Sequence, residues 1–92
     1  MATGTYTIDF GATPADEAIV TVTTSGLGAA DHIEAFVMRD AHTDNGVDEH
    51  EMLAVFGRWS CLYVSATEFT AKCNLIGWLA TGNFKFRWAT AL

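Results

Sequence analysis

The chain has 92 residues, of which half are hydrophobic and 17% are charged, and its net charge is -6. This length predicts one domain covering residues 1–92, and this composition excludes an intrinsically disordered chain. Lys and Arg are scarce, which excludes sequence-independent binding to nucleic acid or to an anionic membrane, because both are bound through their phosphate groups.

Alternation of apolar and polar residues predicts two strands near the start of the chain. In residues 3–10, it places Tyr6, Ile8 and Phe10 on one face and polar side chains on the other. Residues 18–25 alternate in the same way after a turn that contains glycine and proline. Each segment is therefore expected to form a half-buried strand.

Four later segments also predict strands. Residues 32–39 are β-branched and aromatic enough for one, although two helical turns are an alternative. Residues 51–64 are apolar for most of their length and predict a strand with a bend or bulge near Gly57. Residues 68–75 predict another, and residues 84–91 should place an aromatic face in the core.

No segment shows a convincing helical period, threonine is frequent, and glycine- or proline-containing turns recur along the chain. These features predict an all-β fold, either an antiparallel β-sandwich or a small jelly-roll-like barrel of about seven strands.

The stretch RDAHTDNGVDEHEM, residues 39–52, is called the elbow here and carries the densest group of polar side chains. Its centre, TDNG, predicts a turn, because Asn45 and Gly46 tolerate positive φ and Asp44 can bond its own following backbone. The histidines and acids around this turn would then be solvated, bonded to the backbone, or used in contact with another subunit.

The sequence supports three alternative roles of the elbow, a calcium loop, a transition-metal site and a catalytic site, less well than it supports a turn. A calcium loop would use the side chains of Asp40, His42, Asp44, Asp48 and Glu51. However, a histidine replaces one oxygen ligand, the loop glycine comes one place late, and no flanking helices are evident.

A transition metal bound by His42 and His50 would need a spacing that matches no recognised ligand pair. Acid–base catalysis by Asp48, Glu49 or Glu51 lacks a supporting nucleophile or pocket motif. We therefore predict no catalytic residue, no metal ligand and no cofactor, and a protein that is not an enzyme.

The aromatic residues and the cysteines could likewise form a binding site or simply pack in the core. The larger aromatic residues could form a stacking platform, but most are needed to fill the core of so small a fold: Trp59, Tyr63, Trp78, Phe84 and Trp88. Trp78, in a glycine-flanked connection, is the expected exception and would mark an interface if exposed. Cys61 and Cys73 match no zinc signature and are expected to be buried or half-buried thiols.

Charge and hydropathy also suggest how the chain behaves. Residues 1–56 contain ten acidic side chains and one basic one, Arg39, whereas residues 57–92 contain four basic side chains and one acidic one, Glu68. This uneven distribution of charge would orient one copy of the chain relative to another. No stretch has the roughly 18 to 20 apolar residues needed to span a bilayer, and the start lacks a secretory signal. We expect a soluble protein that is made in a cytoplasm.

Three stretches together resemble a group of small β-rich virion proteins of tailed bacteriophages: YTIDFGATPADEAIVTVTTSG, AHTDNGVDEHE and EFTAKCNLIGWLATGNFKFRWAT. That group shows, in this order, an FDFG strand, a VTVTG strand, an acidic stretch of the type ADHxxxEH and a terminal LxGxFxxRW strand. The likeness spans nearly the whole chain. Within it, the elbow is matched by Asp44, Glu49 and His50, and the terminal strand by Phe84, Arg87 and Trp88.

The resemblance implies a structural role in the virion, on the capsid surface or tail, after assembly in the host cytoplasm. A capsid decoration or cement subunit is the first expectation; it would form a trimer or dimer and bind the major capsid protein or another virion protein. We expect the chain from Met1 to Leu92 to be free-standing, which favours this over the alternative, a head- or tail-fibre domain that binds a host glycan or receptor. Asp44, Glu49 and His50 would hold the elbow or contact another subunit, and a small metal-dependent enzyme is the third hypothesis.

Overall fold

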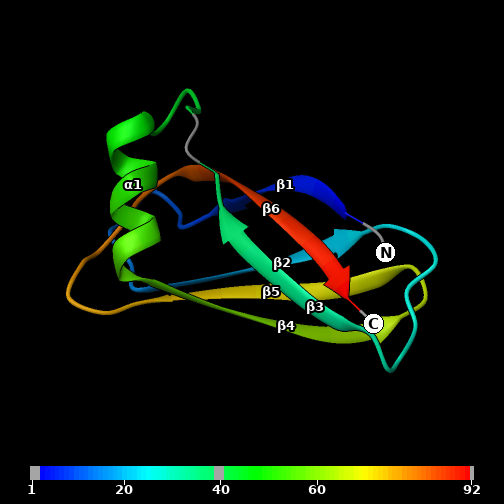
Figure 1. The fold of residues 1–92 in the computed structure, drawn as a ribbon. Helices are drawn as coiled ribbons and strands as arrows, with labels where there is room; N and C mark the ends of the chain where they lie inside the picture. Colours follow the sequence, from blue (N-terminus) through cyan, green and yellow to red (C-terminus); the bar gives the residue numbers. More distant parts are fainter. Residues whose placement is uncertain (1–2, 39–40, 92) are drawn as a thin grey trace.

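Two three-stranded antiparallel sheets make up the protein, and one helix stands at an end of them (Figure 1). The computed structural model describes residues 3–38 and 41–91. Its elements are β1 (Thr3–Asp9), β2 (Glu17–Thr23), β3 (His32–Val37), α1 (Val47–Phe56), β4 (Gly57–Ser65), β5 (Glu68–Leu75) and β6 (Asn83–Ala91). The sheets have the orders β1-β6-β3 and β2-β5-β4. The predicted antiparallel β-sandwich is confirmed, with six strands among the described residues.

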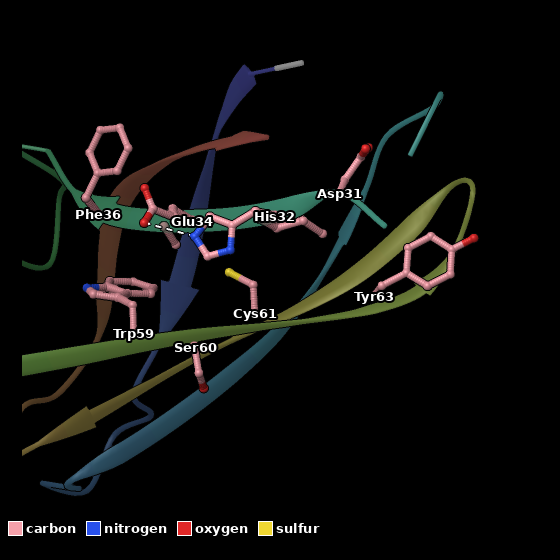
Figure 2. A pocket seen from close by; sticks show the side chains of 10 residues that line it. Asp31, His32, Glu34, Phe36, Trp59, Ser60, Cys61 and Tyr63 are labelled. Atoms are coloured by element: carbon pink, nitrogen blue, oxygen red, sulfur yellow. Dashed lines mark hydrogen bonds and ion pairs between the residues drawn. The ribbon is translucent and has the colours of Figure 1, made fainter. Parts of the chain in front are cut away.

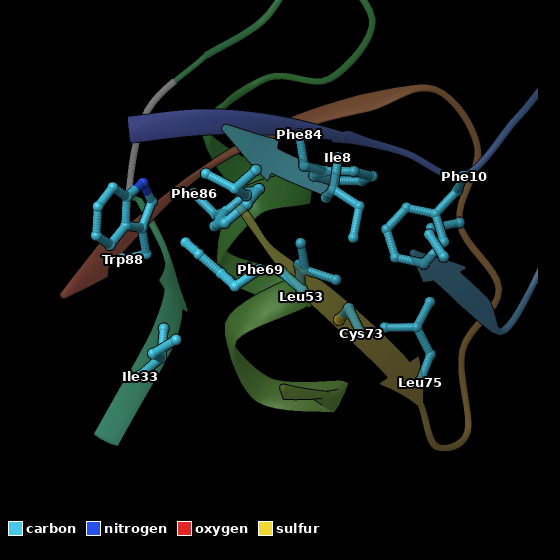
Figure 3. Packing of buried hydrophobic residues seen from close by; sticks show 14 of the residues in the cluster. Ile8, Phe10, Ile33, Leu53, Phe69, Cys73, Leu75, Phe84, Phe86 and Trp88 are labelled. Carbon is cyan, nitrogen blue, oxygen red and sulfur yellow. The ribbon is translucent and has the colours of Figure 1, made fainter. Parts of the chain in front are cut away.

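The two sheets pack face to face, with β3 against β4 and β1 against β2. The alternation of side chains along each strand sends one set of residues into the space between the sheets. This core contains large aromatic and aliphatic side chains from both sheets and from α1 (Figure 3): Ile8, Phe10, Ile33, Leu53, Phe69, Leu75, Phe84, Phe86 and Trp88. Burying one such side chain contributes about 1.5–3 kcal/mol, so the cluster stabilises the sandwich.

β6 is the central strand of its sheet and carries the aromatic face that its sequence predicts. Phe84 pairs with Ile8 of β1, and Phe86 pairs with Tyr6 of β1 and Val37 of β3. Phe84 and Phe86 are fully buried. Of the five aromatic residues expected to fill the core, Phe84 and Trp88 are buried in it, whereas Trp59, Tyr63 and Trp78 are partly buried and pack against it.

The helix α1 contradicts two expectations, that no segment is helical and that a strand begins at residue 51. The run from Glu51 to Ala54 consists of good helix formers, and an oxygen of the Glu49 side chain accepts a hydrogen bond from the backbone N–H of Gly46 at 3.2 Å, which caps the first turn. Only His50 and Leu53 are buried, while Met52 and Val55 remain exposed. The apolar residues thus encircle the helix, which is why no helical stripe is visible in the sequence.

Gly57 ends the helix and starts β4 without an intervening loop. Its N–H bonds to the Leu53 carbonyl oxygen, and a Cβ atom at this position would lie 2.6 Å from that oxygen and 3.1 Å from the sulfur of Cys73. Only glycine fits this approach, so the bend expected near Gly57 is a change from helix to strand. The irregularity within β4 lies instead between Tyr63 and Ser65.

The other predicted strands agree with β1, β2, β5 and β6 to within about two residues at each end. β3 covers residues 32–37 of the segment expected to be a strand, and Arg39 lies outside the described residues. Among the helices that the structure describes, none is long and apolar enough to cross a membrane.

Candidate functional site

The elbow is fastened to the start of β6 by side-chain hydrogen bonds. Asn45 is buried, and its amide nitrogen donates to the carbonyl oxygens of Thr81 and Asn83, each at 2.9 Å. One carboxylate oxygen of Asp44 accepts from the backbone N–H of Asn83 at 3.0 Å and from its side-chain amide at 2.8 Å. These four bonds fix the path of the elbow across the end of the sheet.

The charged form of Asp44 is favoured by these contacts. The side-chain amide of Asn83 is the largest cause that lowers the pKa of Asp44 below 3.8, followed by the Asn83 backbone N–H and, more weakly, by His42, against a small opposing effect of desolvation. Gly82 permits the close approach, because a Cβ atom there would lie 2.8 Å from the Cβ atom of Asp44 and its φ is +76°.

The expected TDNG turn has a different geometry from the one predicted. Asn45 does not have positive φ, and Gly46 has a φ of -84° and serves as the N-cap of α1. The turn is instead closed by the backbone N–H of His42, which donates to the Asn45 carbonyl oxygen at 2.7 Å. Asn45 and Gly46 therefore lead into the N-terminus of α1 and do not form a turn with positive φ.

His50 is fully buried, and both of its ring nitrogens have partners. Nδ1 lies 2.8 Å from the carbonyl oxygen of Gly46, and Nε2 lies 2.9 Å from the backbone N–H of Lys85. Since a carbonyl can only accept and an N–H can only donate, the ring is neutral with its proton on Nδ1. The ring also packs on Phe84, with centroids 5.1 Å apart.

The hydrogen bonds of His42 and His50 occupy ring nitrogens that could otherwise bind a metal ion. His50 could ligate a metal only by losing a hydrogen bond to Gly46 or Lys85, and Nδ1 of His42 already lies 3.3 Å from the backbone N–H of Asp44. Within residues 3–38 and 41–91, no three His, Cys, Asp or Glu side chains are grouped so that they could hold a metal ion. Asp40, the first ligand of the calcium alternative, lies outside the described residues.

The three elbow residues singled out from the sequence therefore all make hydrogen bonds within this region. Asp44 and His50 bond to β6, and Glu49 bonds to the helix N-cap. These bonds support a role in holding the shape of the elbow, and a contact between subunits stays a prediction.

Trp78 is half-buried in the connection between β5 and β6. Its ring lies 6.3 Å from that of Phe56 at the end of α1 and 6.2 Å from that of Phe84 on β6, measured between centroids. It therefore packs between helix and sheet, while its neighbours Ile76 and Leu79 are exposed apolar side chains of this connection. An interface role for Trp78 stays a prediction.

A second candidate site, which we call the seam, lies between β3 and β4, where the two sheets face each other at their free edges. It is a groove of about 500 Å³, open to solvent along one side. Figure 2 shows side chains from both strands meeting across it. Its lining consists of Asp31, His32, Ile33, Glu34, Ala35, Phe36, Trp59, Ser60, Cys61 and Tyr63.

The two walls of the seam differ in chemistry. On β3, the Nε2 atom of His32 lies 3.1 Å from a carboxylate oxygen of Glu34, and both side chains are exposed. On β4, the ring of Trp59 packs on Phe86 with centroids 4.9 Å apart. The thiol of Cys61 is directed from β4 toward the His32 and Glu34 pair (Figure 2). An aromatic wall thus faces an acidic one.

Both cysteines are free thiols, Cys61 half-buried and Cys73 buried, as the sequence predicted. Desolvation is the main cause that raises the pKa of Cys61 to about 11, and the charge of Glu34 adds to it. Desolvation likewise raises the pKa of Cys73 to about 12, against a smaller opposing effect of a hydrogen bond from the backbone N–H of Arg58. At neutral pH both thiols are therefore protonated and weak nucleophiles.

Sequence reasoning missed the seam, although it had noted Trp59 and Tyr63 as aromatic residues. Trp59, Cys61 and Tyr63 alternate along one strand, which was a visible signal. That β3 lies opposite this strand follows from the sheet topology and has no local pattern.

No protein-family model, curated protein or solved structure matches this chain.

Proposed function

We propose that this chain is a structural subunit of a tailed-bacteriophage particle, most directly a capsid decoration protein that forms a small homo-oligomer and binds the major capsid protein. The proposal makes it a binding protein rather than an enzyme. Its sequence support is the resemblance of three ordered stretches to small β-rich virion proteins.

One structural observation carries the proposal. The outer face of the β2-β5-β4 sheet leaves three large apolar side chains in solvent: Ile19 is 62%, Leu62 68% and Val64 51% exposed. Between Ile19 and Leu62 lies a largely apolar hollow of about 330 Å³. Exposed apolar groups gathered on one face of a small protein typically mark a surface that another protein covers.

On a phage particle, a small apolar surface of this kind is sufficient for stable binding. A few apolar contacts per subunit give weak binding on their own, but an oligomer on a repeating lattice binds through several copies at once. The uneven charge of the chain would orient each subunit as it docks.

The test is co-sedimentation with purified particles of the phage that encodes the chain, followed by immunoblotting. We expect the wild-type protein to sediment with particles and Leu62→Glu to remain in the supernatant. Thr5→Glu, on the exposed outer face of the other sheet, is the matched control and should sediment as the wild type does. A wild-type protein that never sediments with particles would contradict the proposal.

A fibre domain that binds a host surface glycan is the second candidate, and Trp59 and Tyr63 in the seam favour it, since sugars stack on aromatic rings. It predicts binding to host surface polysaccharide that is lost in Trp59→Ala. Absence of signal on an array of such glycans would remove this candidate and leave the first in place.

A further inference from the structure

We propose that the seam between β3 and β4 binds an extended peptide segment of a partner protein, and that this segment carries a basic side chain. The seam lies on the opposite side of β4 from the ladder with β5. Its lining shares only Ser60 and Cys61 with the hollow on the outer apolar face.

The backbone of β3 is available along the seam. Met38 lies in register with Lys85, and its N–H donates to the Lys85 carbonyl oxygen at 3.3 Å. Because hydrogen-bonded and non-bonded pairs alternate along an antiparallel ladder, the N–H and C=O groups of Ile33, Ala35 and Val37 point away from β6. These groups form a free strand edge.

The backbone of β4 is available in the same way. The N–H of Ile76 donates to the carbonyl oxygen of Phe56 at 3.1 Å, which sets the phase of the ladder between β4 and β5. The N–H and C=O groups of Trp59, Cys61 and Tyr63 therefore point away from β5. β3 and β4 belong to different sheets, and no backbone hydrogen bond joins them within the described residues.

Two free edges that flank one groove suit an extended peptide better than other ligands. A peptide offers N–H and C=O groups at the spacing of a strand, so it can bond to an exposed edge and add to the sheet. A sugar or a small anion has no such repeating pattern.

The charge of the seam identifies the side chains of the occupant. Its lining includes the carboxylates of Asp31 and Glu34 and contains neither Lys nor Arg. An anionic segment would be repelled, whereas Lys or Arg would pair with Glu34. Asp31 is held in place because it accepts a hydrogen bond from the backbone N–H of Gly28 at 2.9 Å.

The aromatic residues of the seam also indicate which side chains the bound segment carries. Trp59, Tyr63 and Phe36 are among the residues that line the groove, and aromatic rings bind both apolar side chains and the cationic heads of Lys and Arg. A segment in which apolar and basic residues alternate would satisfy the edges, the carboxylates and the rings together.

The test uses the full chain labelled with ¹⁵N and two synthetic peptides, acetyl-TVKVRVT-amide and acetyl-TVEVEVT-amide, which share length and strand propensity and differ in charge. We expect the basic peptide to shift the amide signals of Ile33, Ala35, Trp59 and Cys61 and to slow their hydrogen exchange. The acidic peptide should leave them unchanged.

Variants then locate the contact. Glu34→Lys should weaken binding of the basic peptide by about tenfold or more. Asp16→Lys, which makes the same charge change at an exposed position in the turn before β2, should bind as the wild type does. Circular dichroism of both variants verifies that the fold is retained.

Three results would overturn the proposal: neither peptide perturbs the seam, both peptides perturb it equally, or maltohexaose perturbs it and the basic peptide does not. Each can occur whether or not the protein sediments with particles. Failure of the seam site and failure of the particle role are therefore distinguishable.

Discussion

The imidazole of His50 accepts a hydrogen bond from the backbone N–H of Lys85 at 2.9 Å, across 35 positions of sequence. Its other nitrogen donates to the carbonyl oxygen of Gly46 at 2.8 Å, so one buried side chain links the first turn of α1 to the central strand of a sheet. Neither partner in this buried region can be replaced by water without opening the structure.

Replacing His50 with alanine should lower the free energy of unfolding by about 2–4 kcal/mol, because it leaves a cavity and deprives the Lys85 N–H of its acceptor. His32→Ala is the matched control. Its ring is exposed and pairs with the exposed carboxylate of Glu34, so the change should stay within about 0.5 kcal/mol. Urea denaturation of the two variants measures the difference, and equal effects would contradict the assigned bonds.

Asp44 should make stability depend on pH in the acid range. Hydrogen bonds from Asn83 lower its pKa, so its contribution is fully present above its usual value of 3.8 and is lost as pH falls through the lower, folded value. The gap in Tm between wild type and Asp44→Asn should therefore be constant near neutral pH and should close in acid. Asp16→Asn, which removes one negative charge at an exposed position, is the matched control for the change in net charge.

Gly57→Ala should destabilise the protein by about 1–3 kcal/mol, since the new methyl group would meet the Leu53 carbonyl oxygen at 2.6 Å and must displace the junction of helix and strand. Gly46→Ala is the control, because there the nearest atom, a Glu49 carboxylate oxygen, lies at 3.7 Å. Its effect should be about 1 kcal/mol or less, from the poorer N-cap alone. Thermal denaturation compares the two, and a harmless Gly57→Ala would contradict the described junction.

The two thiols should resist alkylation in the folded protein. With pKa values of about 11 for Cys61 and about 12 for Cys73, both should react with iodoacetamide at pH 8 at least roughly a hundredfold more slowly than an unfolded cysteine. Cys61 should react before Cys73. Because the unfolded thiols ionise first, the free energy of unfolding should also fall as pH rises above 9.0. Mass spectrometry of timed samples measures the order, and rapid labelling of Cys73 in native protein would contradict its burial.

Local patterns were sufficient to predict most of the strands. The alternation of Phe84, Phe86 and Trp88 predicts a strand with a buried face, because burial on one side of a sheet imposes a period of two. The same reasoning fails for α1. Met52 and Val55 are apolar but exposed, so the residues that face the core, His50 and Leu53, do not stand out in the sequence.

The candidate sites depend on contacts between distant segments, and these have no local signal. Asp44, Glu49 and His50 were singled out from the sequence, but their partners at Asn83 and Lys85 follow from the arrangement of β6 beside the elbow. The seam likewise exists because β3 and β4 belong to different sheets and face each other. A pattern within one strand does not specify what lies opposite it.

The place of β6 also sets an order of folding. Within the described part of the chain, β1 and β3 pair with β6 alone. Asp44, Asn45 and His50 bond to residues 81–85, at or beside the start of β6. During synthesis, the β2-β5-β4 sheet can form as soon as residue 75 has left the ribosome, whereas the other sheet must wait for the last strand. Closing loops of this length is slow, so the nascent chain would expose β1 and β3 as unpaired strands until β6 arrives.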